Sequence, residues 1–153
     1  MRLIRGCGNK MHNICFLTRS FRDSKEVSEE NMNHIEGKGV AEALSTELSN
    51  AGWNCESVFA EDFGWAFFAA KGGQKHFITT SVDPDPDGEE EFDVEDYPPV
   101  GTLMFVNINV NLERSLWERL TGANKQQSND GLTELVEKWI KSQSDVSKLE
   151  VHK

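Results

Sequence analysis

Gly72 and Gly73 stand between two runs that have the composition of β-strands, and this pair strongly constrains the fold. A two-residue Gly-Gly loop suits the primed turns that close a β-hairpin, because glycine takes the required positive φ angles at no steric cost. A hairpin that turns at these two residues has one register. The pairs that follow are Phe68 with Phe77, Phe67 with Ile78, and Trp65 with Thr80. The sequence therefore predicts an antiparallel strand pair over residues 65–82.

The predicted hairpin carries aromatic side chains on both of its faces. One face holds Trp65, Phe67, Ala69, His76 and Ile78, and the other holds Ala66, Phe68, Ala70, Phe77 and Thr79. Such a pair is either covered on both sides, or covered on one side with the other left as a binding surface. We favour the structural interpretation, in which these aromatics belong mainly to the core.

Periodicity along the rest of the chain adds strands and helices. Strands are predicted at Asn13–Phe21, Cys55–Ala60 and Val100–Val110. Apolar residues at helical spacing predict helices over 40–51, 112–120 and 132–140. The expected order is β-α-β-β-β-β-α-α, an α+β fold with a mostly antiparallel sheet of about five strands and three helices. Three tryptophans should be largely buried: Trp53, Trp117 and Trp139.

The chain of 153 residues has the length of one domain. We expect a flexible N-terminal segment over 1–12, a single domain over 13–143 and a flexible tail over 144–153. No apolar run approaches the roughly 18–20 residues of a membrane helix, and Arg5 interrupts the apolar stretch near the N-terminus. We therefore expect a cytoplasmic protein without a membrane partner. Its cysteines, Cys7, Cys15 and Cys55, are then expected to be reduced thiols.

Negative charge is concentrated in one segment. The chain has 26 acidic and 16 basic residues, a formal net charge of −10. Nine of the acids fall within fourteen residues that contain no base: Asp83, Asp85, Asp87, Glu89, Glu90, Glu91, Asp93, Glu95 and Asp96. Without them the chain would hold 17 acidic and 16 basic residues. The sequence thus describes a nearly neutral domain with one acidic loop, whose charge argues against nucleic acid as a partner.

The first acids of this loop have the spacing of a calcium site. Asp83, Asp85 and Asp87, followed by Gly88, match the first half of an EF-hand loop. The second half does not match, because Val94 occupies the twelfth position, where a bidentate glutamate belongs. We therefore expect no cofactor, and an irregular calcium site at the three aspartates is the alternative.

The acidic loop also has the character of a protein-binding surface. Charge steers a basic partner toward it, and aromatic side chains among the acids can serve as desolvated anchors. The predicted partner-binding residues are Asp87, Glu89, Glu90, Glu91, Phe92, Asp93, Glu95, Asp96 and Tyr97. The partner is a basic protein, or the basic N-terminal segment of a second copy of this chain. The plain alternative is a solvated loop that keeps the protein soluble.

A second candidate site lies at the start of the hairpin. Glu61 and Asp62 precede Trp65, and a carboxylate beside a tryptophan can have a raised pKa and act as an acid. With His76 they make a candidate pocket for a small carboxylate-based enzyme or a small-molecule-binding domain. The structural interpretation, which we favour, is that Asp62 and Gly64 shape the turn into the hairpin. We expect no metal site and favour a protein that is not an enzyme, because no recognised catalytic motif is present.

Three short motifs are similar to a pattern found in small bacterial proteins that have no assigned function. In these proteins a helix ends in Gly-Trp, a short strand leads to an acid-aromatic-Gly-Trp turn, and a hairpin follows. The matching residues here are Gly52-Trp53, Asp62-Phe63-Gly64-Trp65 and Gly72-Gly73. The resemblance implies a bacterial accessory protein, for example an immunity protein that neutralises a toxin.

Overall fold

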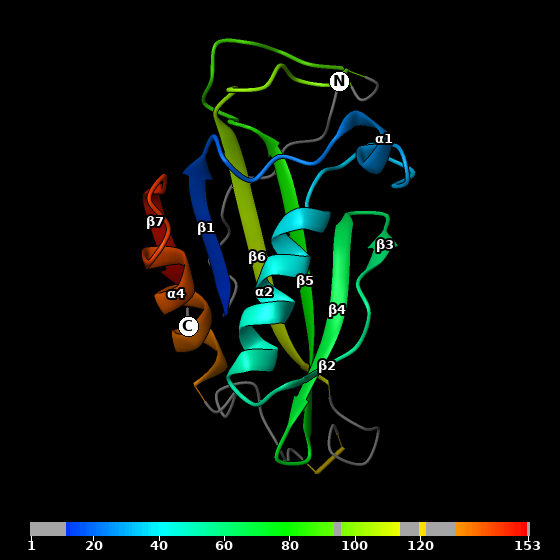
Figure 1. The fold of residues 1–153 in the computed structure, drawn as a ribbon, viewed down its shortest axis with the longest axis vertical. Coiled ribbons are helices and arrows are strands. Elements are labelled where there is room, and N and C mark those ends of the chain that lie inside the picture. The colour runs from blue at the N-terminus through cyan, green and yellow to red at the C-terminus, as the bar shows by residue number, and fades with distance from the viewer. Residues whose placement is uncertain (1–11, 94–95, 114–119, 122–130, 153) are drawn as a thin grey trace.

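The computed structural model describes residues 12–93, 96–113, 120–121 and 131–152. Within these residues the fold is α+β, as predicted: one antiparallel sheet with three helices (Figure 1). The helices are α1 (Lys25–Ser28), α2 (Lys38–Asn50) and α4 (Leu132–Lys141). The helix predicted over 112–120 lies largely outside the described residues, and Trp117 with it. Leu112 itself belongs to a strand.

The sheet has seven strands rather than about five. They are β1 (Asn13–Thr18), β2 (Asn54–Cys55), β3 (Phe59–Glu61), β4 (Gly64–Lys71), β5 (Gln74–Pro84), β6 (Met104–Glu113) and β7 (Ser147–His152). Their order across the sheet is β2-β4-β5-β6-β1-β7, and β3 also pairs with β4. All of these pairings are antiparallel. The sequence therefore predicted the class of fold correctly and the number and order of its elements incorrectly.

The β4–β5 hairpin has the register that the two glycines predict. Phe68 pairs with Phe77, and Trp65 pairs with Thr80. Gly72 and Gly73 have φ angles of 60° and 80°, which is the left-handed region that a primed turn requires. The turn chemistry alone was sufficient to set this register, because each residue of the hairpin is counted from the turn.

The main core lies between one face of the sheet and the helices α2 and α4, which cross it in Figure 1. The helices contribute Val40, Leu44, Leu48, Leu132, Val136 and Ile140, and the sheet contributes Phe67, Ile78, Val106 and Ile108. Trp53 and Trp139 are buried, as predicted. On the opposite face Phe59 stacks on Phe68 and on Phe77, the rings of Phe68 and Phe77 are tilted by 39°, and all three side chains are half-buried. The hairpin aromatics Trp65 and Phe67 thus belong to the core, whereas those of the opposite face form a half-buried cluster outside it.

The predicted strand over 55–60 is divided in two. Cys55 pairs with Ala69, whereas Phe59 pairs with Ala66. Four steps along one strand therefore match three steps along β4, so one extra residue interrupts the pairing as in a β-bulge. Periodicity could not show this, because the insertion does not change the composition of the segment.

The expected flexible tail over 144–153 contains strand β7. Val151 pairs with Ile14, and Val146, Leu149 and Val151 pack against the core. The expectation of a tail without structure is therefore corrected for residues 147–152. The physical reason is that β1 is a wholly buried strand, whose backbone groups need a hydrogen-bonding neighbour on each side. The expected N-terminal segment over 1–12 lies outside the described residues except for His12.

Cys55 is a free thiol, as predicted, but Cys15 is disulfide-bonded. Cysteine spacing did not indicate this bond. Disulfides are uncommon in cytosolic proteins, so the bond does not favour the cytoplasmic location, which stays a prediction. Within the described part of the chain, no helix is long and apolar enough to cross a membrane.

Candidate functional site

The acidic loop begins where β5 and β6 separate. Asp83 still pairs with Phe105 in the sheet, and the backbone N–H of Asp85 donates to the carbonyl of Leu103 at 3.1 Å. Asp85 then turns the chain. Its carboxylate accepts from the N–H of Asp87 at 3.0 Å, and its carbonyl accepts from the N–H of Gly88 at 3.0 Å. The start of the loop is thus fixed to the sheet by backbone and side-chain hydrogen bonds.

Beyond this turn the acids lie in solvent. Asp87, Glu89, Glu90, Glu91, Asp93 and Asp96 are exposed, and Phe92 is half-buried. Among the described residues, no lysine, arginine or histidine forms an ion pair with Asp85, Asp87, Glu89, Glu90 or Glu91. Asp93 and Asp96 form a local turn, in which the N–H of Asp93 donates to the Asp96 carboxylate at 2.8 Å. Glu95 lies outside the described residues.

The far end of the loop is held by Arg22. Its Nη2 and Nη1 donate to the carbonyls of Pro98 and Pro99 at 2.7 and 2.8 Å. Its guanidinium lies over the ring of Tyr97, 5.1 Å from the ring centre, and the Tyr97 hydroxyl donates to the carbonyl of Asp23 at 2.6 Å. Tyr97 therefore contacts its own domain through both its ring and its hydroxyl, so it acts as an internal anchor of the loop.

Arg22 belongs to a buried charge cluster, which we define as Arg22, Asp23 and Glu36. Arg22 makes a bidentate ion pair with the fully buried Glu36, with Nε–Oε1 at 2.8 Å and Nη2–Oε2 at 2.9 Å. The carboxylate of Asp23 accepts from the N–H groups of Gly37, Lys38 and Gly39 at 2.8–2.9 Å. These groups begin helix α2 and have no partner within the helix, so Asp23 caps it from a distant part of the chain.

The cluster shifts the pKa values of two side chains. Burial would lower the pKa of the Arg22 guanidinium, but the hydrogen bonds and charge of Glu36 outweigh it, and the pKa is raised above its ordinary value. Burial raises the pKa of the Tyr97 hydroxyl, and the charge of Glu36 raises it further. Arg22 therefore stays charged and Tyr97 stays protonated over the physiological range.

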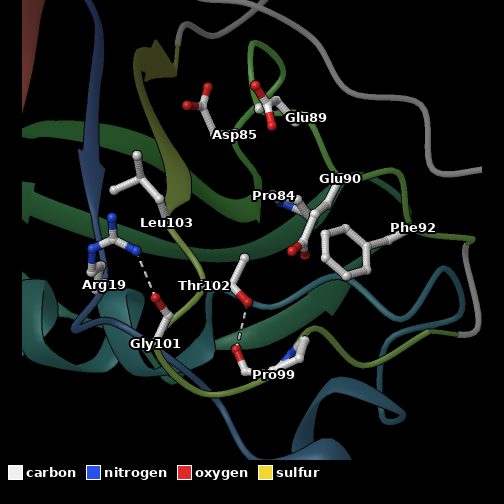
Figure 2. A pocket seen from close by; sticks show the side chains of 11 residues that line it. Arg19, Pro84, Asp85, Glu89, Glu90, Phe92, Pro99, Gly101, Thr102 and Leu103 are labelled. Atoms are coloured by element: carbon white, nitrogen blue, oxygen red, sulfur yellow. Dashed lines mark hydrogen bonds between the residues drawn. The ribbon is translucent and has the colours of Figure 1, made fainter.

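A hollow of about 350 Å³ lies between the acidic loop and the turn that leads into β6. It is lined by Arg19, Pro84, Asp85, Gly88, Glu89, Glu90, Phe92, Pro99, Gly101, Thr102 and Leu103. Figure 2 shows Glu90 and Phe92 extending from one side of the hollow toward Thr102 and Pro99 on the other. Arg19 lies at the opposite end, where its Nη1 donates to the carbonyl of Gly101 at 2.7 Å. The hollow combines carboxylates with an apolar wall.

The aspartates of the possible calcium site are part of this region. Asp83 lies in the paired part of β5, whereas Asp85 and Asp87 lie in the turn. Over the described ranges, no group of three or more His, Cys, Asp or Glu side chains is arranged to hold a metal ion. Calcium binding at these aspartates stays the alternative to the expected absence of a cofactor.

The second candidate pocket does not assemble. Glu61 and Asp62 lie at the turn between β3 and β4, Asp62 exposed, whereas Trp65 is buried and donates its Nε1–H to the carbonyl of Ile35 at 2.9 Å. His76 is fully buried against Trp53, with ring centres 5.4 Å apart. Trp65 pairs with Thr80, four residues along β5 from His76, a separation of about 14 Å at ~3.4 Å per residue. No single cleft holds these groups.

Sequence reasoning missed the buried charge cluster and a pair of exposed apolar side chains, Met32 and Phe63. The segment from Arg22 to Gly37 showed no clear periodicity, so nothing in the pattern indicated that Glu36 is buried. A useful signal would have been the joint presence of Arg22, Asp23 and Glu36 in an otherwise irregular segment.

Comparison with known proteins finds no protein-family model, no curated protein and no solved structure that matches this chain.

Proposed function

We propose that this protein is a non-enzymatic binding module whose acidic loop, residues 83–97, contacts a basic protein partner. The observation that carries the proposal is the state of the carboxylates. Five of them have no ion-pair partner in the described part of the chain: Asp85, Asp87, Glu89, Glu90 and Glu91. Yet the loop is held at both ends, by Asp85 on the sheet and by Arg22 at Pro98–Pro99. A tethered loop that concentrates unneutralised charge is suited to a cationic partner.

Holding the ends of the loop reduces the entropy lost when a partner binds. Ordering a free loop of this length would cost part of the binding energy. Phe92 supplies an aromatic side chain at the edge of the hollow, beside Glu90 (Figure 2). A lysine or arginine side chain entering there would meet both a carboxylate and an aromatic ring, a combination that favours cations.

An immunity-type role is the form of this function that the sequence motifs suggest. The cationic active site of a toxin would be a fitting target, because an inhibitor must cover it with opposite charge. A second copy of this chain is the other candidate partner, through its basic N-terminal segment. The enzyme alternative has no supporting observation, because Asp62, Trp65 and His76 do not share a cleft.

The test is a triple variant, Glu89→Gln/Glu90→Gln/Glu91→Gln, compared with the parent in capture from lysate of the source cell. Each captured protein is then purified, and its Kd is measured by calorimetry at low and high salt. We expect a weaker Kd and a smaller salt dependence for the variant, because fewer charges face the partner. Sedimentation of the purified protein at both salt concentrations distinguishes self-association from a foreign partner.

The matched control is Glu42→Gln/Glu47→Gln/Glu150→Gln, which removes the same charge from α2 and β7. This control should bind like the parent, since its charges are remote from the loop. Equal binding by the parent and by the loop variant, with equal salt dependence, would reduce the loop to a solvated surface.

A further inference from the structure

Met32 and Phe63 are large apolar side chains that face solvent. Their exposed fractions are 82% and 51%, respectively. They come from different loops: Met32 lies between α1 and α2, and Phe63 lies in the turn between β3 and β4. Exposing such groups is unfavourable, so an exposed apolar pair held in place is a candidate contact for another molecule.

Hydrogen bonds join the two loops at the residues next to Met32 and Phe63. The buried side-chain amide of Asn31 donates to the carbonyls of Glu61 and Gly64 at 2.6 and 2.7 Å. The amide of Asn33 donates to the carbonyl of Asp62, and its backbone N–H donates to Asn31 Oδ1 at 2.9 Å. The residues on either side of Met32 are therefore bonded to residues on either side of Phe63.

The two hydrogen-bonded loops are fixed to the sheet. Gly64 has a φ of 146°, and a Cβ at this position would come within 2.2 Å of the Thr80 carbonyl, so the turn lies directly on β5. Trp65 adds its hydrogen bond to Ile35, which lies in the loop that carries Met32. The backbone that displays Met32 and Phe63 is thus ordered before any partner arrives, which lowers the entropic cost of binding.

This surface lies at the same end of the sheet as the acidic loop. β4 begins at Gly64, next to the Trp65–Thr80 pair, and β5 continues four residues beyond Thr80 to Pro84, where the acidic loop leaves the sheet. Figure 1 shows the loop across the upper end of the molecule, with α1 and the β3–β4 turn beside and below it. Arg22, three residues before α1, holds the end of the acidic loop at Pro98–Pro99.

The rim of the apolar pair is acidic. Glu61 and Asp62 directly precede Phe63 in the chain, and neither carboxylate forms an ion pair with any described residue. The lysines nearest in sequence to Met32 are engaged, since Lys25 pairs with Glu29 at 3.9 Å and Lys38 pairs with Glu30 at 3.3 Å. An apolar centre inside an acidic rim complements a partner that presents apolar side chains among lysines and arginines.

We propose that Met32 and Phe63 form the apolar anchor of the contact with the basic protein that the acidic loop attracts. The inference rests on the proposed function and assigns different roles in binding to the two surfaces. The loop supplies long-range attraction and rate of association, and the Met32–Phe63 pair supplies desolvated contact that slows dissociation. The Met32–Phe63 pair also takes the place of Tyr97 as the proposed apolar anchor, because the ring and hydroxyl of Tyr97 make contacts within the domain.

The experiment begins with a photo-crosslinker. Phe63→p-benzoylphenylalanine, expressed in the source cell, should crosslink one protein of basic isoelectric point when illuminated. The same crosslinker at Leu120, which is 74% exposed and belongs to neither surface, should not trap that protein. The crosslinked protein is then purified, and its Kd is measured for the parent, for Met32→Ser/Phe63→Ser, for Leu120→Ser and for the Glu89/Glu90/Glu91→Gln variant.

We expect Met32→Ser/Phe63→Ser to weaken the Kd roughly tenfold or more, mainly through faster dissociation, whereas Leu120→Ser leaves it unchanged. Since Met32 and Phe63 are exposed, the double variant should melt within a few degrees of the parent, which excludes misfolding as the cause. If the loop variant weakens binding and the double variant does not, this inference fails and the proposed function stands. If the loop variant binds like the parent, both fail. A crosslink to a second copy of the chain overturns the assignment to a foreign protein.

Discussion

The buried charge cluster and the acidic loop contain the same kinds of carboxylate in opposite circumstances. Glu36 is fully buried and Asp23 is 8% exposed, and the charge on each is compensated by Arg22 or by three backbone N–H groups. The carboxylates of Glu89, Glu90 and Glu91 are exposed and have no compensating cation among the described residues. Arg22 connects the two regions, because it binds Glu36 on one side and the end of the loop on the other.

The difference shows that one chain can use acidic residues for two purposes. Carboxylates inside the domain must be paired, since an isolated buried charge costs several kcal/mol, on the order of the whole stability of a domain. The carboxylates of Glu89, Glu90 and Glu91 are expected to contribute little to stability, and their mutual repulsion opposes it slightly. Mutations in the two regions should therefore have separable consequences, on folding in one and on binding in the other.

The largest effect is expected from Arg22→Ala. This change leaves Glu36 as a buried charge without its partner, and we expect unfolding to become easier by about 3–5 kcal/mol. Urea unfolding followed by tryptophan fluorescence measures it. Arg19→Ala is the matched control, because Arg19 is exposed and should cost less than about 1 kcal/mol. Similar losses from both substitutions would show that Arg22 contributes no more than a surface arginine.

A smaller effect is expected from Tyr97→Phe, which removes the hydrogen bond to the Asp23 carbonyl and retains the ring under Arg22. The expected loss of stability is about 1 kcal/mol. The loop should become more mobile near Pro98, which faster backbone hydrogen exchange would reveal. Unchanged stability and exchange would mean that the loop is held by Arg22 without help from Tyr97.

The pKa of Tyr97 gives a direct measurement on the same contact. Tyr97 is the one tyrosine in the sequence, so absorbance near the phenolate band reports it without interference from other tyrosines. We expect the pKa of Tyr97 to lie above the ordinary tyrosine value of about 10, because burial and the charge of Glu36 disfavour the phenolate. Because the pKa of Tyr97 is higher in the folded protein than in the unfolded chain, its contribution to stability is complete below the unfolded-state pKa. This contribution is lost as the pH rises through the folded-state pKa. A pKa of Tyr97 at or below the unfolded value would contradict the burial of its hydroxyl and the nearby charge of Glu36.

The smallest effect on stability is expected from Glu89→Gln/Glu90→Gln/Glu91→Gln. The change in unfolding free energy should stay within about 0.5 kcal/mol, because these side chains pair with no cation in the described part of the protein. Any shift should be toward higher stability at low salt, where repulsion among the carboxylates is least screened. A clear loss of stability would mean that the loop acids do take part in folding.

The parts of the fold that were predictable depend on neighbours in sequence. The β4–β5 register followed from Gly72-Gly73, and helix α2 followed from apolar residues spaced by three and four. The buried cluster was not predictable, because Glu36 and Arg22 are fourteen residues apart in a segment without periodicity. Strand β7 was missed for a similar reason, since its partner β1 lies at the other end of the chain.

The candidate site was predicted in part. The acidic loop was evident from composition alone, and most of its described acidic side chains are exposed. Composition could not show that Tyr97 folds back onto Asp23, or that Asn31 and Asn33 join the loops that carry Met32 and Phe63. These features depend on contacts between loops, for which local sequence patterns carry no signal.

The position of β1 between β6 and β7 has a consequence for synthesis of the protein. Ile14 pairs with Ile108 and with Val151, so the first strand of the chain has no sheet neighbour until more than half of the chain has been made. At roughly 5–20 residues per second the ribosome takes about 4–17 seconds to proceed from the end of β1 to the start of β6, and longer to reach β7. During that time an apolar strand containing Ile14 and Phe16 is exposed in the nascent chain. Chaperone binding to this strand, and aggregation of chains that end before β6, are the expected results.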